Sequence, residues 1–112
     1  MSIDIATLID IRDAIDRATT FAVGMDFDGF VREQRNMWAV YSQIIVIGEA
    51  ATRISPEFRQ MHPHVPWKNM IGMRHRLIHG YDEIKWRKVW ETVIEDLPRL
   101  KSVIEPLIPK ES

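Results

Sequence analysis

The sequence predicts an all-α fold, because its apolar residues recur at helical spacing nearly everywhere and its glycines and prolines fall between these patterns or at single points within them. The chain has 112 residues, of which 46% are hydrophobic and 28% are charged, as in an ordinary globular domain. It contains no cysteine, which excludes disulfides, thiolate zinc sites and cysteine nucleophiles. We therefore expect one domain over residues 1–112, an up-and-down helical bundle of four main helices plus a short one.

The first main helix is expected from Ser2 to about Thr20. Apolar residues repeat there in steps of three and four, while charged residues occupy the other faces. The apolar positions are Ile5, Leu8, Ile11, Ile15 and Ala18. This pattern is typical of an amphipathic helix with one face on the core.

A long second helix is expected from about Phe30 to Ile54, with Asp28 as its N-cap. Its centre, residues 38–51, is apolar on almost every side, and the length of the pattern favours a helix over a buried strand. Gly48 costs a helix about 1 kcal/mol relative to alanine, which indicates close approach of another helix. Because one small bundle cannot cover so apolar a helix, the sequence predicts a homodimer.

The run Ser55-Pro56-Glu57 predicts a short third element, with an N-cap serine, a proline at the first helical position and an end near Met61. Residues 62–66 are expected to form a stiff link. This link carries two histidines across a proline, but with no acid nearby they favour a linker over a metal site.

A third main helix is expected from Trp67 to Gly80, and the last helix from Asp82 or Glu83. The last helix has an apolar stripe formed by Trp86, Trp90, Val93, Leu97, Leu100, Ile104 and Leu107. Pro98 falls inside this helix, where it removes a backbone donor and clashes with an earlier carbonyl. We therefore expect a bend near residues 94–97.

Three tryptophans, Trp38, Trp86 and Trp90, lie at helical spacing. Tryptophan rings can stack on nucleic-acid bases, but this spacing favours positions in the core.

Basic residues are concentrated in the middle of the chain. Residues 53–88 hold eight basic and three acidic side chains, whereas residues 1–52 hold four and eight, and residues 89–112 hold three and five. All four histidines also lie in this middle block. Such a local positive field suits a polyanion such as RNA or a nucleotide. The alternative is a solvated basic face balanced by acidic neighbours or by a second subunit.

The most informative segment, residues 72–81, contains Arg74 five residues before His79. On a continuous helix the two would lie about 140° apart, so they can meet a common ligand only if the helix ends at His79, which Gly80 permits. Arg74 would then hold a phosphate, and His79 would move protons as base and acid. The alternative is that Arg74 and Arg76 are simply solvated and that His79 caps the helix.

The stretch Arg74-x4-His79-x-Tyr81 resembles the motif of HepT-like ribonucleases, the minimal HEPN toxins that are paired with MntA-like nucleotidyltransferase antitoxins. The resemblance covers nearly the whole chain, including residues 47–51, which are similar to the family's Gly-Glu-Ala segment, and the Pro-Trp that leads into the arginine. One departure is His75, where the family usually has asparagine. His75 either replaces that asparagine, as a polar contact or a second titrating group, or marks weakened catalysis.

The resemblance implies a HEPN-like bundle that dimerises so that two motifs line a shared cleft. It also implies metal-independent RNA cleavage by Arg74 and His79, with no cofactor, and inactivation when the antitoxin transfers AMP from ATP to Tyr81. From the residues alone, a core position for Tyr81 is the alternative. His75 and Arg76 are possible supporting residues.

Glu49 is a further possible supporting residue. It is a carboxylate in the most apolar helix, and it is expected to pair with Arg53 or Arg74 rather than to act directly.

Two other functions remain as alternatives: a non-catalytic accessory subunit that binds the nucleotidyltransferase, and a purely structural dimerisation module. The chain has no Gly-rich phosphate loop and no carboxylate cluster for Mg²⁺, so it is not expected to be the ATP-using partner.

No apolar run approaches the roughly 18 residues of a membrane helix, and the N-terminus is acidic where a signal peptide is basic. We expect a cytoplasmic protein that does not engage membranes.

Overall fold

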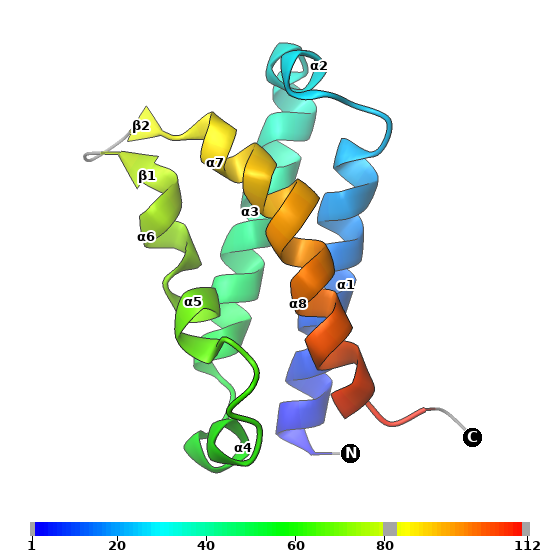
Figure 1. The fold of residues 1–112 in the computed structure, drawn as a ribbon, viewed down its shortest axis with the longest axis vertical. Helices are drawn as coiled ribbons and strands as arrows, with labels where there is room; N and C mark the ends of the chain where they lie inside the picture. The colour runs from blue at the N-terminus through cyan, green and yellow to red at the C-terminus, as the bar shows by residue number, and fades with distance from the viewer. Residues whose placement is uncertain (1, 80–82, 111–112) are drawn as a thin grey trace.

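The computed structural model describes residues 2–79 and 83–110, and within them it is all-α apart from one short hairpin (Figure 1). The first helix, α1, spans Ile3–Ala22, and the Oγ of Ser2 accepts a hydrogen bond from the backbone N–H of Ile5 at 3.1 Å. Most of its predicted apolar positions are buried, namely Leu8, Ile11, Ile15 and Ala18. The predicted first helix is therefore confirmed, with two further residues at its C-terminal end.

The expected helix over residues 30–54 is instead two helices, α2 (Phe27–Arg32) and α3 (Gln34–Thr52). The predicted N-cap was wrong, because the carboxylate of Asp26, not that of Asp28, accepts the N–H of Gly29 at 2.8 Å. Glu33 separates the helices with a non-helical backbone (φ −110°, ψ 82°). The break turns α2 across the end of the bundle, as Figure 1 shows.

The short helix α4 (Pro56–Met61) has the predicted bounds, and the Oγ of Ser55 caps it by accepting the N–H of Phe58 at 3.1 Å. Ser55 also donates from its N–H and its hydroxyl to the carboxylate of Asp4, at 2.8 and 2.7 Å, which ties α4 to the start of α1. In the link that follows, the carbonyl of His62 accepts a hydrogen bond from the indole N–H of Trp67 at 2.9 Å.

The third main helix ends earlier than predicted and is divided. It consists of α5 (Trp67–Ile71) and α6 (Met73–Leu77), separated at Gly72. The strand β1 (Ile78–His79) follows and pairs antiparallel with β2 (Glu83–Ile84).

This hairpin was not predicted from the sequence. The carbonyl of Leu77 accepts the N–H of Lys85 at 2.7 Å, and β-branched Ile78 and Ile84 pair across the strands, so hairpin bonds replace the expected last helical turn. The expected helix end, Gly80, lies outside the described residues.

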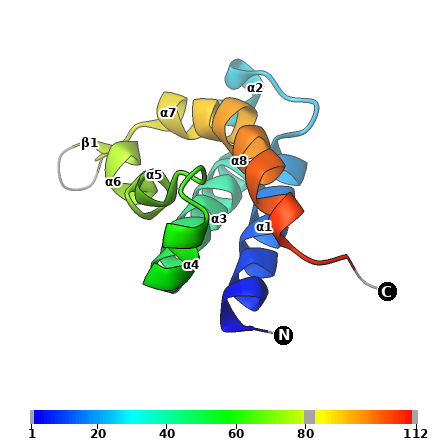
Figure 2. The ribbon, with the colours of Figure 1, turned by 60° about the horizontal axis from the view of Figure 1, so that its bottom comes forward.

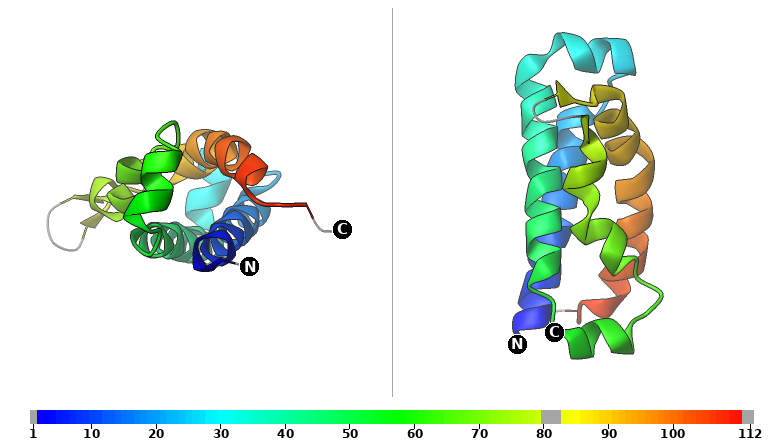
Figure 3. Two further views of the ribbon diagram at one scale, coloured as in Figure 1. Left: turned by 90° about the horizontal axis from the view of Figure 1, so that it is seen from below. Right: turned by 90° about the vertical axis from the view of Figure 1, so that its left-hand side faces the viewer.

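The last helical rod begins at Trp86, later than predicted, and has three consecutive parts. These are α7 (Trp86–Glu91), a π-helical segment (Thr92–Asp96) and α8 (Leu97–Ile104), and a 3-10 turn (Glu105–Leu107) follows. The N–H of Leu97 donates to the carbonyl of Thr92, five residues earlier. The irregularity therefore lies directly before Pro98, where it was expected, and it takes the form of a π turn. The right-hand view of Figure 3 shows the rod curving.

The core lies between α1 and α3, which run side by side, with α8 packed on α1 and with α5 and α6 packed on α3 (Figures 2 and 3). Two of the predicted core tryptophans, Trp86 and Trp90, are half-buried against Phe30. The prediction for Trp38 was wrong, because its side chain is 53% exposed on the outer face of α3. None of the helices among the described residues is long and apolar enough to cross a membrane.

Candidate active site

Helix α6 presents three consecutive basic side chains to solvent. Met73 and Leu77 are buried and anchor the helix, whereas Arg74, His75 and Arg76 are exposed. At about 100° per residue, Arg74 and Arg76 point to opposite flanks of α6. In the described part of the chain, neither arginine forms an ion pair, so both guanidinium groups are available to an anion.

His79 lies in β1 rather than at a helix end. Because α6 ends at Leu77 and Ile78 is extended (φ −110°, ψ 130°), the separation of about 140° expected on a continuous helix does not apply. The required break before His79 is present, and it comes two residues earlier than predicted. Arg74 and His79 therefore belong to two successive elements, both at the exposed edge of the molecule where α6 runs into the hairpin (Figure 1).

Sequence reasoning missed Glu83 as a neighbour of His79. The two residues pair across the hairpin, and the Nδ1 of His79 lies 3.5 Å from Oε2 of Glu83. Their side chains are 71% and 79% exposed, so the pair contributes little to stability. It places Nδ1 of the imidazole beside a carboxylate. The sequence does contain a glutamate four residues after the histidine, but the two residues can be recognised as a pair only when the strand register is known.

The predicted pairing of Glu49 was wrong. Its side chain is exposed on the outer face of α3, and among the ion pairs of the described residues none joins it to Arg53 or Arg74. The expected burial cost therefore does not arise. The neighbouring prediction is confirmed, since α5 passes so close to Gly48 that a Cβ there would lie 3.2 Å from the carbonyl oxygen of Met70.

Exposed apolar side chains lie on the outer face of α3, beside the half-buried Tyr41 and Ile45. Trp38 is 53% exposed and Val46 is 38% exposed. The Trp38 ring meets those of Tyr41 and Trp86 edge to face, with centroids 5.9 and 5.1 Å apart. We call Trp38, Tyr41, Ile45 and Val46 the α3 stripe.

Tyr81, the expected AMP acceptor, lies outside the described residues.

Comparison with known proteins agrees with the family resemblance found in the sequence. A family model described as "Ribonuclease HepT-like" matches residues 11–107. The chain is 38% identical over 100 residues to a protein of Thermococcus cleftensis named "Probable ribonuclease HepT", covering 89% of this chain and 91% of that one. It is 36% identical over 100 residues to "Putative RNase MJ1380" of Methanocaldococcus jannaschii, covering 89% and 92%. No solved structure gives a significant match.

Proposed function

Because this chain belongs to the ribonuclease HepT-like family, we propose that it is a metal-independent endoribonuclease in which Arg74 and His79 are the catalytic residues. One observation carries the proposal. Helix α6 ends at Leu77, with Arg74 exposed in its last turn and His79 exposed in the strand that follows. An arginine that has no carboxylate partner among the described residues, five residues before an accessible imidazole, suits attack on a phosphodiester.

In the proposed reaction, an imidazole takes the proton of the ribose 2′-hydroxyl, and the 2′-oxygen attacks the adjacent phosphorus. The bond to the 5′-oxygen breaks, and that oxygen receives a proton from a second, protonated imidazole. The guanidinium of Arg74 neutralises the charge that builds up on the phosphoryl oxygens. Glu83 acts as a positioning residue, because a carboxylate beside Nδ1 of His79 leaves Nε2 for the proton transfer.

A homodimer would supply the second imidazole. The α3 stripe supports this part of the proposal, because Trp38 and Val46 are large apolar groups exposed on the outer face of a long helix. If the stripes of two copies pack together, two motifs can line one cleft. His75 and Glu49 are exposed polar groups on α6 and α3 and are proposed supporting residues of that cleft, whereas Arg76 points to the opposite flank of α6 from Arg74.

We further propose that the protein is the cytoplasmic toxin of a type VII-like toxin–antitoxin pair. A small nucleotidyltransferase would catalyse attack of the Tyr81 hydroxyl on the α-phosphorus of ATP, with pyrophosphate leaving. The added phosphate would compete for the cations that hold the RNA, and the adenosine would fill the cleft.

A second function is favoured by His75, which stands where the family usually has asparagine. A chain that had lost cleavage would still bind the nucleotidyltransferase as an accessory subunit. Cleavage of RNA in the presence of EDTA, and its loss in His79→Ala, separates the two functions.

A further inference from the structure

A cavity of about 460 Å³ lies between α5–α6 and α8, on the flank of α6 that carries Arg76. The two sides belong to different parts of the bundle, because α8 packs on α1 whereas α5 and α6 pack on α3. Met70 of α5 and Met73 of α6 line it on one side, and Asp96, the last residue of the π-helical segment, lines the other. Arg74 is not among the lining residues, so the cavity is separate from the candidate catalytic pair.

The floor of the cavity is apolar and includes the buried side chains of Met70, Met73 and Leu100. Methionine is polarizable and adaptable, and its sulfur makes favourable contacts with aromatic rings. Binding pockets for small molecules typically combine such walls with a few polar groups, in volumes of roughly 300–1,000 Å³. A floor of this kind suits a flat aromatic group.

The lining also includes two exposed arginines, Arg76 and Arg99, one from each side of the cavity. A Cβ added at Gly72 would lie 3.9 Å from Nη1 of Arg76, so this side chain folds back along α6. Neither arginine forms an ion pair with Asp96 or with any other carboxylate among residues 2–79 and 83–110. Two such cations suit a phosphate, which arginine binds through paired hydrogen bonds.

We propose that this cavity binds a nucleoside monophosphate group. The base lies on the methionine floor, the phosphate lies between Arg76 and Arg99, and Asn69 and Asp96 form hydrogen bonds with the polar edge of the base or with the ribose. The same chemistry is found in a free nucleotide and in the 5′-phosphorylated end of an RNA strand. The inference is independent of RNA cleavage, because it concerns the flank of α6 opposite Arg74.

Titration of the full chain with AMP, followed by calorimetry and by NMR shifts of α6 and α8 residues, tests the proposal. AMP should bind, while adenosine and ribose 5-phosphate should each bind at least about 10-fold more weakly, because each lacks one half of the recognised group. Arg76→Ala and Arg99→Ala should each weaken AMP binding by about 10-fold or more. The matched control Arg32→Ala removes an exposed arginine from α2 and should bind AMP as the wild type does.

A further variant, Val103→Trp, fills the cavity from α8 without removing a charge and should also block AMP. Circular dichroism on every variant checks that it is folded. Failure of AMP to bind at millimolar concentration would overturn the proposal, as would equal affinity of the wild type and the double variant Arg76→Ala/Arg99→Ala. None of these readouts depends on RNA cleavage, so a failure here is distinguishable from a failure of the proposed ribonuclease activity.

Competition with a short RNA distinguishes the two sources of the ligand. If a 5′-phosphorylated oligonucleotide displaces AMP and its 5′-hydroxyl counterpart does not, the cavity accepts an RNA end. If neither displaces AMP, the cavity accepts the free nucleotide. Both results support recognition of a nucleoside monophosphate, whereas equal displacement by both oligonucleotides contradicts the role given to the two arginines.

Discussion

The backbone carbonyl oxygen of Met70 packs tightly against Gly48, where an added Cβ atom would lie only 3.2 Å from it. This contact sets how closely α5 packs on α3, and α5 leads through Gly72 into α6, which carries Arg74. The glycine in the most apolar helix is therefore explained by helix packing beneath the candidate site.

Substitutions at Gly48 should separate helix propensity from packing. Gly48→Ala should change the free energy of unfolding by less than about 1 kcal/mol, because the gain in helix propensity opposes the tight contact with Met70. Gly48→Val should destabilise the protein by about 1–3 kcal/mol, because its branched side chain cannot fit without moving α5. Chemical denaturation measures both, and equal stability of the two variants would contradict the packing argument.

The α3 stripe should hold two copies of the chain together. Trp38→Ser combined with Val46→Ser removes its most exposed apolar groups and should convert a dimer into a monomer at micromolar concentration. Light scattering measures the mass. As a control, Ile3→Ser removes an apolar residue that is 80% exposed at the start of α1 and should leave the dimer intact. A monomeric wild type would rule out both the dimer and the shared cleft.

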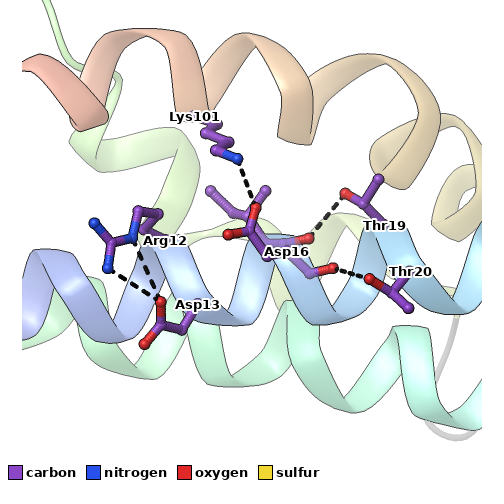
Figure 4. Close-up of polar contacts among 7 residues, drawn as sticks. Arg12, Asp13, Asp16, Thr19, Thr20 and Lys101 are labelled. Atoms are coloured by element: carbon purple, nitrogen blue, oxygen red, sulfur yellow. Dashed lines mark hydrogen bonds and ion pairs between the residues drawn. The ribbon is translucent and has the colours of Figure 1, made fainter.

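A surface ion pair joins the last helix to α1, with Nζ of Lys101 donating to Oδ1 of Asp16 at 2.8 Å (Figure 4). This hydrogen bond raises the pKa of Lys101 above its ordinary value of 10.5. Its contribution to stability is therefore fully present below the unfolded-state pKa and is lost as the pH rises through the folded-state pKa. Because both side chains are partly exposed, the contribution should stay below about 1 kcal/mol.

Denaturation of wild type and Lys101→Met at increasing pH measures this effect. The difference in unfolding free energy should be constant at neutral pH and should shrink above about pH 10.5, where the unfolded-state lysine begins to lose its proton. Arg32→Met is the control, because arginine stays charged over this range and the exposed Arg32 of α2 is not among the groups that shift the pKa of Lys101. If the difference in unfolding free energy grew as the pH rises, the assignment of the raised Lys101 pKa to this ion pair would be wrong.

Modification of Tyr81 should silence RNA cleavage. Incubation with the cognate nucleotidyltransferase, ATP and Mg²⁺ should add mass in whole AMP units at Tyr81 and abolish activity, because the phosphate competes for the cations of the site. Tyr81→Phe should block the modification, whereas the control Tyr41→Phe should not. Mass spectrometry that located AMP on another residue would make this account of regulation wrong while leaving the ribonuclease assignment intact.

The sequence predicted the helical class and the main helices because burial periodicity extends over whole helices, as in α1, and because local caps such as Ser55 act within one turn. It missed features that depend on contacts between elements. The hairpin is closed by the bond from Lys85 to the carbonyl of Leu77, and no periodicity indicates such a bond. Glu49 and Trp38 were misjudged because an apolar run does not show which side of a helix the other helices cover.

For the candidate site, the residue types were predictable and their setting was not. Arg74 and His79 follow from a motif that resembles a known family, and a helix break before His79 followed from helix geometry. The break at Leu77, the Glu83 neighbour and the cavity beside Arg76 depend on strand register and on how α8 packs. These are tertiary relationships, so they required the structure.

The most direct test of the account is cleavage of single-stranded RNA by the purified protein in EDTA, with wild type, His79→Ala, Arg74→Ala and Glu83→Gln compared under the same conditions. We expect the wild type to cleave, and we expect His79→Ala to lose about 10²–10⁴-fold in rate, as for removal of a general acid–base group. Arg74→Ala should also lose most activity, and Glu83→Gln should lose less than His79→Ala. Equal cleavage by wild type and His79→Ala, or cleavage that EDTA abolishes, would contradict the account.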